Sequence, residues 1–209
     1  RKIKIIGVQS ANAASYVPSL KSGKVTQIAT KPTIADGIAV AKPGQIPFDL
    51  IKTHIDKVVT VTDDDIAKAI VTLLERSKLV VEPAGAVTVA ALMTGAFKPK
   101  GRTVAVLSGG NFDPLLMQKV IGHGLVASDR YVTISVMLPD RPGQLVKTAE
   151  AIASAHGNVV EVLHTRHGDD FDISEVELRV SVETTGAEHS QRVLKALNDA
   201  GLKARVAKN

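Results

Sequence analysis

The sequence predicts an α/β protein made of two parts: a layer with a mostly parallel sheet and helices, followed by a smaller unit whose elements run βαββαβ. In residues 1–125, short apolar strands alternate with helical patterns, which favours a parallel sheet because each helix returns the chain for the next strand. From residue 131 the pattern changes, and a glycine-containing stretch at 122–129 separates the two patterns. We therefore expect a first domain at 1–125, a linker at 126–130 and a second domain at 131–209.

The first part begins with a β-branched strand and continues as alternating elements. Strands are expected at 3–8, 57–61 and 103–107, and helices at 11–21, 63–77, 84–92 and 115–121. The helix at 63 has the clearest start, because Thr62 offers a capping hydroxyl and the three aspartates at 63–65 place negative charge at the positive end of the helix dipole. We interpret this acidic cluster as a capped, solvated helix start and not as a metal site.

The second part follows the ferredoxin-like plan. Strands are expected at 131–138, 159–167, 173–182 and 203–206, helices at 145–155 and 188–199, and turns at 139–143 and 168–170. In this plan two helices cover one face of an antiparallel sheet. One sheet edge stays available for pairing or for a ligand.

Composition excludes several classes of protein. The chain has 209 residues, 44% of them apolar, and no cysteine, which rules out a disulfide scaffold or a thiolate metal site. No apolar run approaches the roughly 18 residues of a membrane span, so we predict a cytoplasmic protein with no membrane partner. The net charge is +5, but the basic residues are scattered and aromatic residues make up only 3% of the chain, so no nucleic-acid partner is expected.

Two short motifs offer polar groups next to glycine or proline. Ser108-Gly109-Gly110-Asn111 ends the strand expected at 103–107, where two glycines allow a close backbone approach. Taken alone, Ser108 caps the helix that follows and the glycines relieve a tight turn. Glu82 stands directly before Pro83 at a helix start, where the dipole stabilises a carboxylate.

Four motifs in order resemble those of one enzyme family. The segments 34–40, 59–66, 82–86 and 108–111 are similar, in order and approximate spacing, to those of threonine ammonia-lyases (threonine dehydratases) and related serine racemases, which are fold-type II pyridoxal-phosphate enzymes. The second part resembles an ACT domain, a regulatory module for small ligands, through its segments 140–143, 161–166 and 175–178. The resemblance covers nearly the whole chain, as the C-terminal part of such an enzyme's large domain and a single ACT domain.

The resemblance implies a cofactor, a reaction and a set of site residues. Pyridoxal 5'-phosphate would lie with its pyridine nitrogen beside Ser108, with Gly109 and Asn111 in the same turn, Glu82 close to the ring and substrate, and the backbone of Gly37 near the ring. The implied reaction converts L-threonine to 2-oxobutanoate and ammonia, in isoleucine biosynthesis or threonine catabolism. A serine dehydratase or serine racemase relative is the alternative within this class. For Gly37 and its neighbour Asp36, a simple turn is an equally good local interpretation.

Departures from the family pattern are equally informative. The Schiff-base lysine in its Ser-Phe-Lys-x-Arg-Gly motif and the glycine run that holds the cofactor phosphate are both absent. We therefore expect a C-terminal portion that is inactive alone, contains no catalytic residue of its own and has the missing N-terminal portion as its partner. Some relatives hold a divalent ion at positions that correspond here to Gln9, Ala13 and Ser15, so no metal site is expected.

The ACT resemblance implies a second ligand. Asp140, Arg141 and Gly143, with His164 and Arg166 on the next strand, fall where such modules bind an amino acid or meet another subunit. A branched-chain effector such as isoleucine or valine, allosteric regulation and a homo-oligomer (dimer or tetramer) are expected. The alternatives are that the turn is structural and the domain only builds the oligomer, or that the chain is a catalytically silent amino-acid-binding module.

Overall fold

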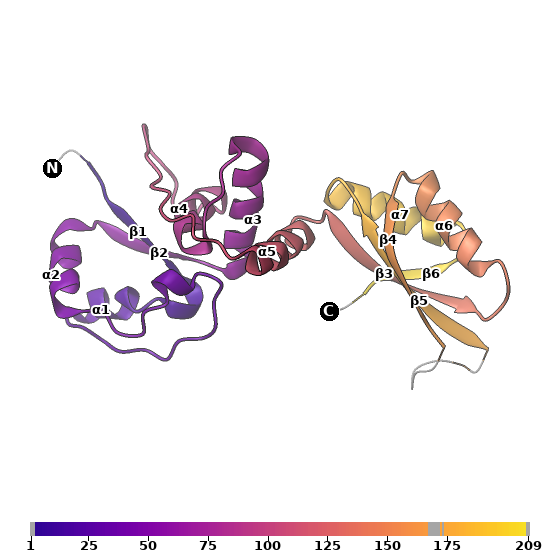
Figure 1. The fold of residues 1–209 in the computed structure, drawn as a ribbon, viewed down its shortest axis with the longest axis horizontal. Helices are drawn as coiled ribbons and strands as arrows, with labels where there is room; N and C mark the ends of the chain where they lie inside the picture. The colour runs from indigo at the N-terminus through magenta and orange to yellow at the C-terminus, as the bar shows by residue number, and fades with distance from the viewer. Residues whose placement is uncertain (1–2, 167–171, 173, 208–209) are drawn as a thin grey trace. The chain divides into compact units, whose positions relative to one another are not determined.

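The computed structural model describes residues 3–166, 172 and 174–207. The chain divides into two compact units, residues 1–124 and 125–209, and each is described by itself (Figure 1). Their architecture confirms the predicted fold class, since a parallel strand pair with helices is followed by a βαββαβ unit.

The parallel pair of the first unit joins β1 (Ile6–Ser10) to β2 (Lys57–Val61), with Ile6 beside Lys57 and Ser10 beside Val61. β2 has the predicted bounds, whereas β1 lies further along the chain than the predicted 3–8. The connection contains the 3-10 turns η1 (Ala11–Ala13) and η2 (Asp36–Ile38) and the helices α1 (Tyr16–Ser22) and α2 (Gln45–His54). A parallel pair requires a crossover of this kind.

Helix α3 (Asp63–Thr72) begins with a reciprocal capping box. Thr62 Oγ1 accepts a hydrogen bond from Asp65 N at 3.2 Å, and the Asp65 carboxylate accepts one from Thr62 N at 3.0 Å. Ile66 and Ile70 are buried. The last predicted turn is a π-helical segment, η3 (Leu73–Ser77), which ends at Lys78 with a φ of 58°.

Two further helices complete the first unit's core. They are α4 (Pro83–Met93) and α5 (Pro114–Ala127). Residues 122–127, which the sequence suggested as the start of a linker, are therefore helical. Within this helix, a Cβ atom on Gly124 would lie 2.8 Å from Ala67 O, so the glycine lets α5 approach α3 closely.

The strand expected at 103–107 does not form. Residues 103–107 are irregular, and Val104 and Val106 are 82% and 67% exposed. A strand is defined by its hydrogen-bonded neighbour, and no strand of the described chain pairs with this segment. The sequence has the composition of a strand, but the pairing partner is not among the described residues.

The second unit has the predicted order of elements: β3 (Tyr131–Pro139), α6 (Gln144–Ser154), β4 (Asn158–Thr165), β5 (Glu175–Glu183), α7 (Ala187–Asp199) and β6 (Lys203–Val206). The sheet is antiparallel with the order β4-β5-β3-β6. Both helices cover the same face (Figure 1), where Ile134 and Val180 pack with Ile152 and Val193. The predicted turn at 168–170 and the end of the strand predicted to reach residue 167 lie outside the described residues.

Within the described part of the chain, no helix has the length and apolar character that crossing a bilayer requires.

Candidate functional site

The site begins at Glu82, the residue that precedes α4. Its backbone is extended, with φ −63° and ψ 156°, and its side chain makes no capping hydrogen bond to the helix. Many N-cap residues direct their side chains back to the helix amides. The half-buried Glu82 carboxylate instead remains available to the space in front of the helix.

Gly109 lies directly against this carboxylate. Glu82 N donates a hydrogen bond to Gly109 O at 3.2 Å. The φ of Gly109 is +80°, and a Cβ atom at this position would stand 2.1 Å from Glu82 Oε1. Glycine is therefore required here both by the backbone conformation and by the close approach of Glu82.

The preceding residue, Ser108, is fixed against the first turn of α4. A Cβ atom on Gly85 would lie 1.7 Å from Ser108 O, so the helix and the backbone of Ser108 are in contact only because residue 85 is glycine. Thr88 Oγ1 also donates to Val106 O at 2.9 Å. The Ser108 hydroxyl has no hydrogen-bond partner within the described chain.

Gly37 approaches the same helix start from η2. A Cβ atom on Gly37 would lie 3.2 Å from Ala84 Cβ and 4.0 Å from Glu82 Oε1. Gly37 N donates to Asp36 Oδ1 at 2.8 Å, so Asp36 is engaged in a local turn. Segments that are more than 70 positions apart in sequence thus meet at the beginning of α4.

Four of the five predicted cofactor residues, Gly37, Glu82, Ser108 and Gly109, are brought together by these contacts. Asn111 is exposed in the same turn. The arrangement fits a polar cofactor ring, because the Ser108 hydroxyl and the Glu82 carboxylate remain uncommitted and the glycines let the segments that carry them come together. Such a ring carries the chemistry, whereas the protein supplies binding and orientation.

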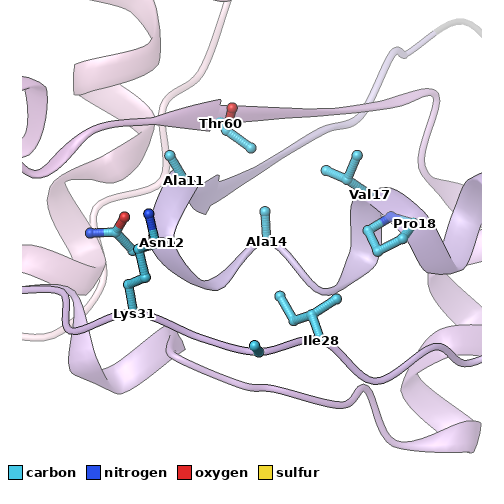
Figure 2. Close-up of a pocket in the computed structure, with 9 residues that line it drawn as sticks. Ala11, Asn12, Ala14, Val17, Pro18, Ile28, Lys31 and Thr60 are labelled. Carbon is cyan, nitrogen blue, oxygen red and sulfur yellow. The ribbon is translucent and has the colours of Figure 1, made fainter.

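A cavity of about 340 Å³ lies beside the carboxyl ends of β1 and β2. Figure 2 shows Asn12 and Lys31 at one end of the cavity and Val17 and Pro18 at the other. Between these ends, Thr60 lies on the wall that faces Ile28. None of the predicted cofactor residues lines this cavity, so we assign the site from the contacts of Glu82.

Among the positions compared with a divalent ion site, Gln9 is committed to hydrogen bonds within the protein. Gln9 is buried; its Nε2 donates to Ala13 O at 3.4 Å, and its Oε1 accepts from Tyr16 N at 3.0 Å. The Ser15 hydroxyl is buried without a partner in the described chain. Among the described residues, no group of three His, Asp or Glu side chains is placed to hold a metal ion.

The predicted effector residues lie in the second unit. Arg166 Nη2 is 3.7 Å from Asp140 Oδ1, and both side chains are largely exposed. Gly143 has a φ of 90° and precedes α6, whereas His164 lies on β4 opposite Leu178. Asp140 and Arg166 are thus brought together, while the side chains of Arg141 and His164 are exposed.

Sequence reasoning missed two residues that hold the segment bearing Gly37. Thr33 Oγ1 donates to Asp63 Oδ1 at 2.5 Å, and Ile34 N donates to Asp63 Oδ2 at 3.1 Å. Asp63 was interpreted only as part of a helix start. A contact across 30 positions leaves no local pattern in the sequence.

The sequence of this chain matches two protein families. Residues 1–109 match the family of pyridoxal-phosphate dependent enzymes, and residues 132–202 match the ACT domain. An L-threonine ammonia-lyase of Geobacter sulfurreducens is 44% identical over 99% of this chain and 52% of its own length. One from Thermotoga maritima is 39% identical over 98% of this chain and 51% of its own length.

A solved structure is similar to part of this chain. The processed form of threonine deaminase isoform 2 from Solanum lycopersicum superposes with a TM-score of 0.53 and 35% identity, covering 57% of this chain and 36% of that one. The chain spans about half the length of the curated relatives that it matches. These matches confirm the resemblance drawn from the sequence: the chain belongs to the family of pyridoxal-phosphate dependent enzymes and carries an ACT domain after its catalytic-type unit.

Proposed function

We propose that this chain is the C-terminal part of a threonine ammonia-lyase that converts L-threonine to 2-oxobutanoate and ammonia. The observation that carries the proposal is the meeting of Gly37, Glu82, Ser108 and Gly109 at the start of α4. It is supported by two relatives, both named L-threonine ammonia-lyase, that match this chain along nearly its whole length.

The chain's own residues bind and orient the cofactor. Bound pyridoxal phosphate acidifies the α-proton of an amino acid and takes up its electron pair. Ser108 would hold the cofactor ring through a neutral hydroxyl, and the ring would then be a weaker electron sink than it would be with a carboxylate partner. A weaker electron sink favours elimination over transamination. Glu82 offers a hydrogen-bond acceptor on the same side of α4.

The rest of the active site comes from the part of the protein that precedes this chain. Because the chain spans about half the length of its curated relatives and lacks the lysine and glycine-run motifs, we assign the Schiff-base lysine and the phosphate-binding glycines to that part. The segment at 103–107 is irregular and exposes Val104 and Val106, and its strand-like composition lets it pair with a strand from that part.

The second unit regulates the enzyme by binding an amino acid. The exposed pair of Asp140 and Arg166 presents a carboxylate and a guanidinium, the two groups that an amino acid's ammonium and carboxylate would meet. Isoleucine or valine is the expected ligand. Equilibrium dialysis with labelled isoleucine should show saturable binding that Arg166→Ala removes and Arg192→Ala does not.

The test of the proposed reaction uses the protein purified from its native source. Intact mass and a visible absorbance scan are recorded on one sample, followed by an assay for 2-oxobutanoate from threonine. We expect a chain about twice the 22.0 kDa of this one, or a second chain that remains bound, together with the absorbance of a lysine-bound cofactor and activity. A pure 22.0 kDa protein without colour or activity would contradict the proposal and favour a silent binding module.

A further inference from the structure

We propose that Asp63 is a positioning residue of the cofactor site, acting through a carboxylate clamp on the segment 33–37. The proposal rests on the proposed function, because this segment contains Gly37 and places it close to Glu82 in the candidate cofactor site. Asp63 itself touches neither residue in the contacts described above. Its effect on the site passes through Thr33 and Ile34.

The clamp uses both oxygens of one carboxylate. Oδ1 accepts from the Thr33 hydroxyl at 2.5 Å, and Oδ2 accepts from the Ile34 amide at 3.1 Å. Hydrogen bonds to a charged acceptor are shorter and stronger than neutral ones. Asp63 is also the first residue of α3, where the helix dipole stabilises its negative charge.

Thr33 extends the clamp to the sheet. Its only hydroxyl proton goes to Asp63, so its oxygen accepts from the Ser10 hydroxyl at 2.9 Å and from Ala35 N at 3.2 Å. Ser10 is fully buried at the end of β1. Thr33 thus connects the start of α3, the end of β1 and the backbone that leads to Gly37.

The neighbouring aspartates have other roles, which separates the clamp from helix capping. Asp65 forms the capping box with Thr62, and Asp64 contacts His123 at 2.6 Å. The helix start therefore keeps its cap without Asp63. Two hydrogen bonds of residues 33–37 stay within the local turn, from Ile38 N to Ala35 O and from Ala39 N to Asp36 O, and those that reach other parts of the described chain go to Asp63 and Ser10.

Loss of the clamp should let the segment 33–37 move and weaken cofactor binding. Asp63→Asn keeps the size of the side chain but presents an NH2 group to one of two donors, Thr33 or Ile34. One charged hydrogen bond is worth about 1.5–3 kcal/mol, so we expect the dissociation constant for pyridoxal phosphate to rise by roughly tenfold or more. Asp64→Asn is the matched control, because it removes the same charge one position further on.

The experiment measures two quantities. Cofactor affinity is determined in the complete protein by absorbance titration with pyridoxal phosphate, and hydrogen exchange of the amides of residues 34 and 35 is measured in the same protein. Asp63→Asn and Thr33→Val should raise both the dissociation constant and the exchange rates, and Thr33→Ser should restore both because it keeps the hydroxyl. A change confined to thermal stability would indicate a merely structural role and overturn the proposal.

Failure of the clamp and failure of the proposed function give different results. If the wild-type complete protein does not bind pyridoxal phosphate, the proposed function is wrong, and hydrogen exchange at residues 34 and 35 still decides whether Asp63 holds the segment. If the wild type binds the cofactor and Asp63→Asn matches Asp64→Asn in affinity and exchange, the clamp is overturned while the function stands.

Discussion

Gly109 lies so close to Glu82 that a Cβ atom on the glycine would stand 2.1 Å from Glu82 Oε1. Two demands meet at this position, since the φ of +80° disfavours any L-residue and the carboxylate occupies the space of a side chain. The Glu82 side chain is flexible enough to turn away, but it would then leave its place against Gly109.

Gly109→Ala is therefore expected to weaken cofactor binding more than it destabilises the fold. The left-handed conformation costs roughly 1–2 kcal/mol for alanine, and the displaced carboxylate removes an acceptor from the site. Urea unfolding of this chain and cofactor titration of the complete protein measure the two effects. Gly110→Ala is the control, because its Cβ would have an ordinary contact of 3.7 Å with Val80 O; equal effects of the two variants would contradict the argument.

Gly85→Ala should destabilise the first unit although alanine favours a helix. Its Cβ would lie 1.7 Å from Ser108 O, a backbone atom that cannot rotate aside, and overpacking of this kind costs about 1–3 kcal/mol. Gly122→Ala in α5 meets nothing within 4 Å and should stabilise the chain by up to about 1 kcal/mol. Urea midpoints that move in the same direction for both variants would show that Ser108 does not constrain residue 85.

Gln9→Glu is expected to create binding of Mg²⁺ or Ca²⁺, and we expect the wild type to show none. In the wild type, the Gln9 amide occupies Ala13 O. A carboxylate would instead join that carbonyl and the buried, unpartnered Ser15 hydroxyl as hard oxygen ligands. Calorimetric titration with MgCl2 and CaCl2 tests this, with the exposed Gln45→Glu as control. Saturable divalent binding by the wild type would disprove the expectation.

The edge strand β4 should mediate self-association. Val160 and Leu163 are 54% and 57% exposed on it, and β4 contains neither lysine nor proline, the residues that commonly protect an edge. Val162 is 40% exposed on the same strand, and Val162→Lys should shift the mass measured by light scattering towards that of one chain. Val206→Lys is the matched control, because Val206 is an exposed valine on the opposite edge strand, β6; the same shift in both would argue against pairing through β4.

Alkaline pH should destabilise the first unit through Tyr16. Burial raises the pKa of the Tyr16 phenol above its ordinary value of 10.0, so the folded state holds this proton more tightly than the unfolded state does. The stabilisation is complete below the unfolded pKa and is lost as pH rises through the folded pKa. The chain has two tyrosines and no tryptophan, so Tyr131→Phe leaves Tyr16 as the sole phenol for absorbance titration. A midpoint at or below that of the urea-unfolded variant would refute the shift.

The sequence predicted those elements whose signals are local. β2 has the predicted bounds because apolar alternation ends at Val61 and a capping hydroxyl follows at Thr62. The segment 103–107 has the same apolar character, but strand formation depends on a partner elsewhere in space. Gly124 suggested a break in the chain, whereas in the fold it lets two helices approach.

The candidate site shows the same division. Glu82, Ser108 and Gly109 were found because they belong to motifs, and the structure explains their meeting through the glycines at positions 85 and 109. The hydrogen bond from Thr33 to Asp63 joins residues 30 positions apart. The apolar periodicity after Asp63 predicts only the helix that begins there. Contacts between an irregular segment and a helix end become visible only in three dimensions.

The pairing of β1 with β2 also determines when this part of the chain can fold during its synthesis. Ile5 and Asp56, which contact each other where the pair begins, are 51 positions apart. At translation rates of about 5–20 residues per second, β1 waits roughly 3–10 s for its partner. Force-sensitive arrest of nascent chains should register folding of this pair only after residue 61 has left the ribosome. Until then, a newly made β1 is an unprotected apolar strand that chaperones can bind.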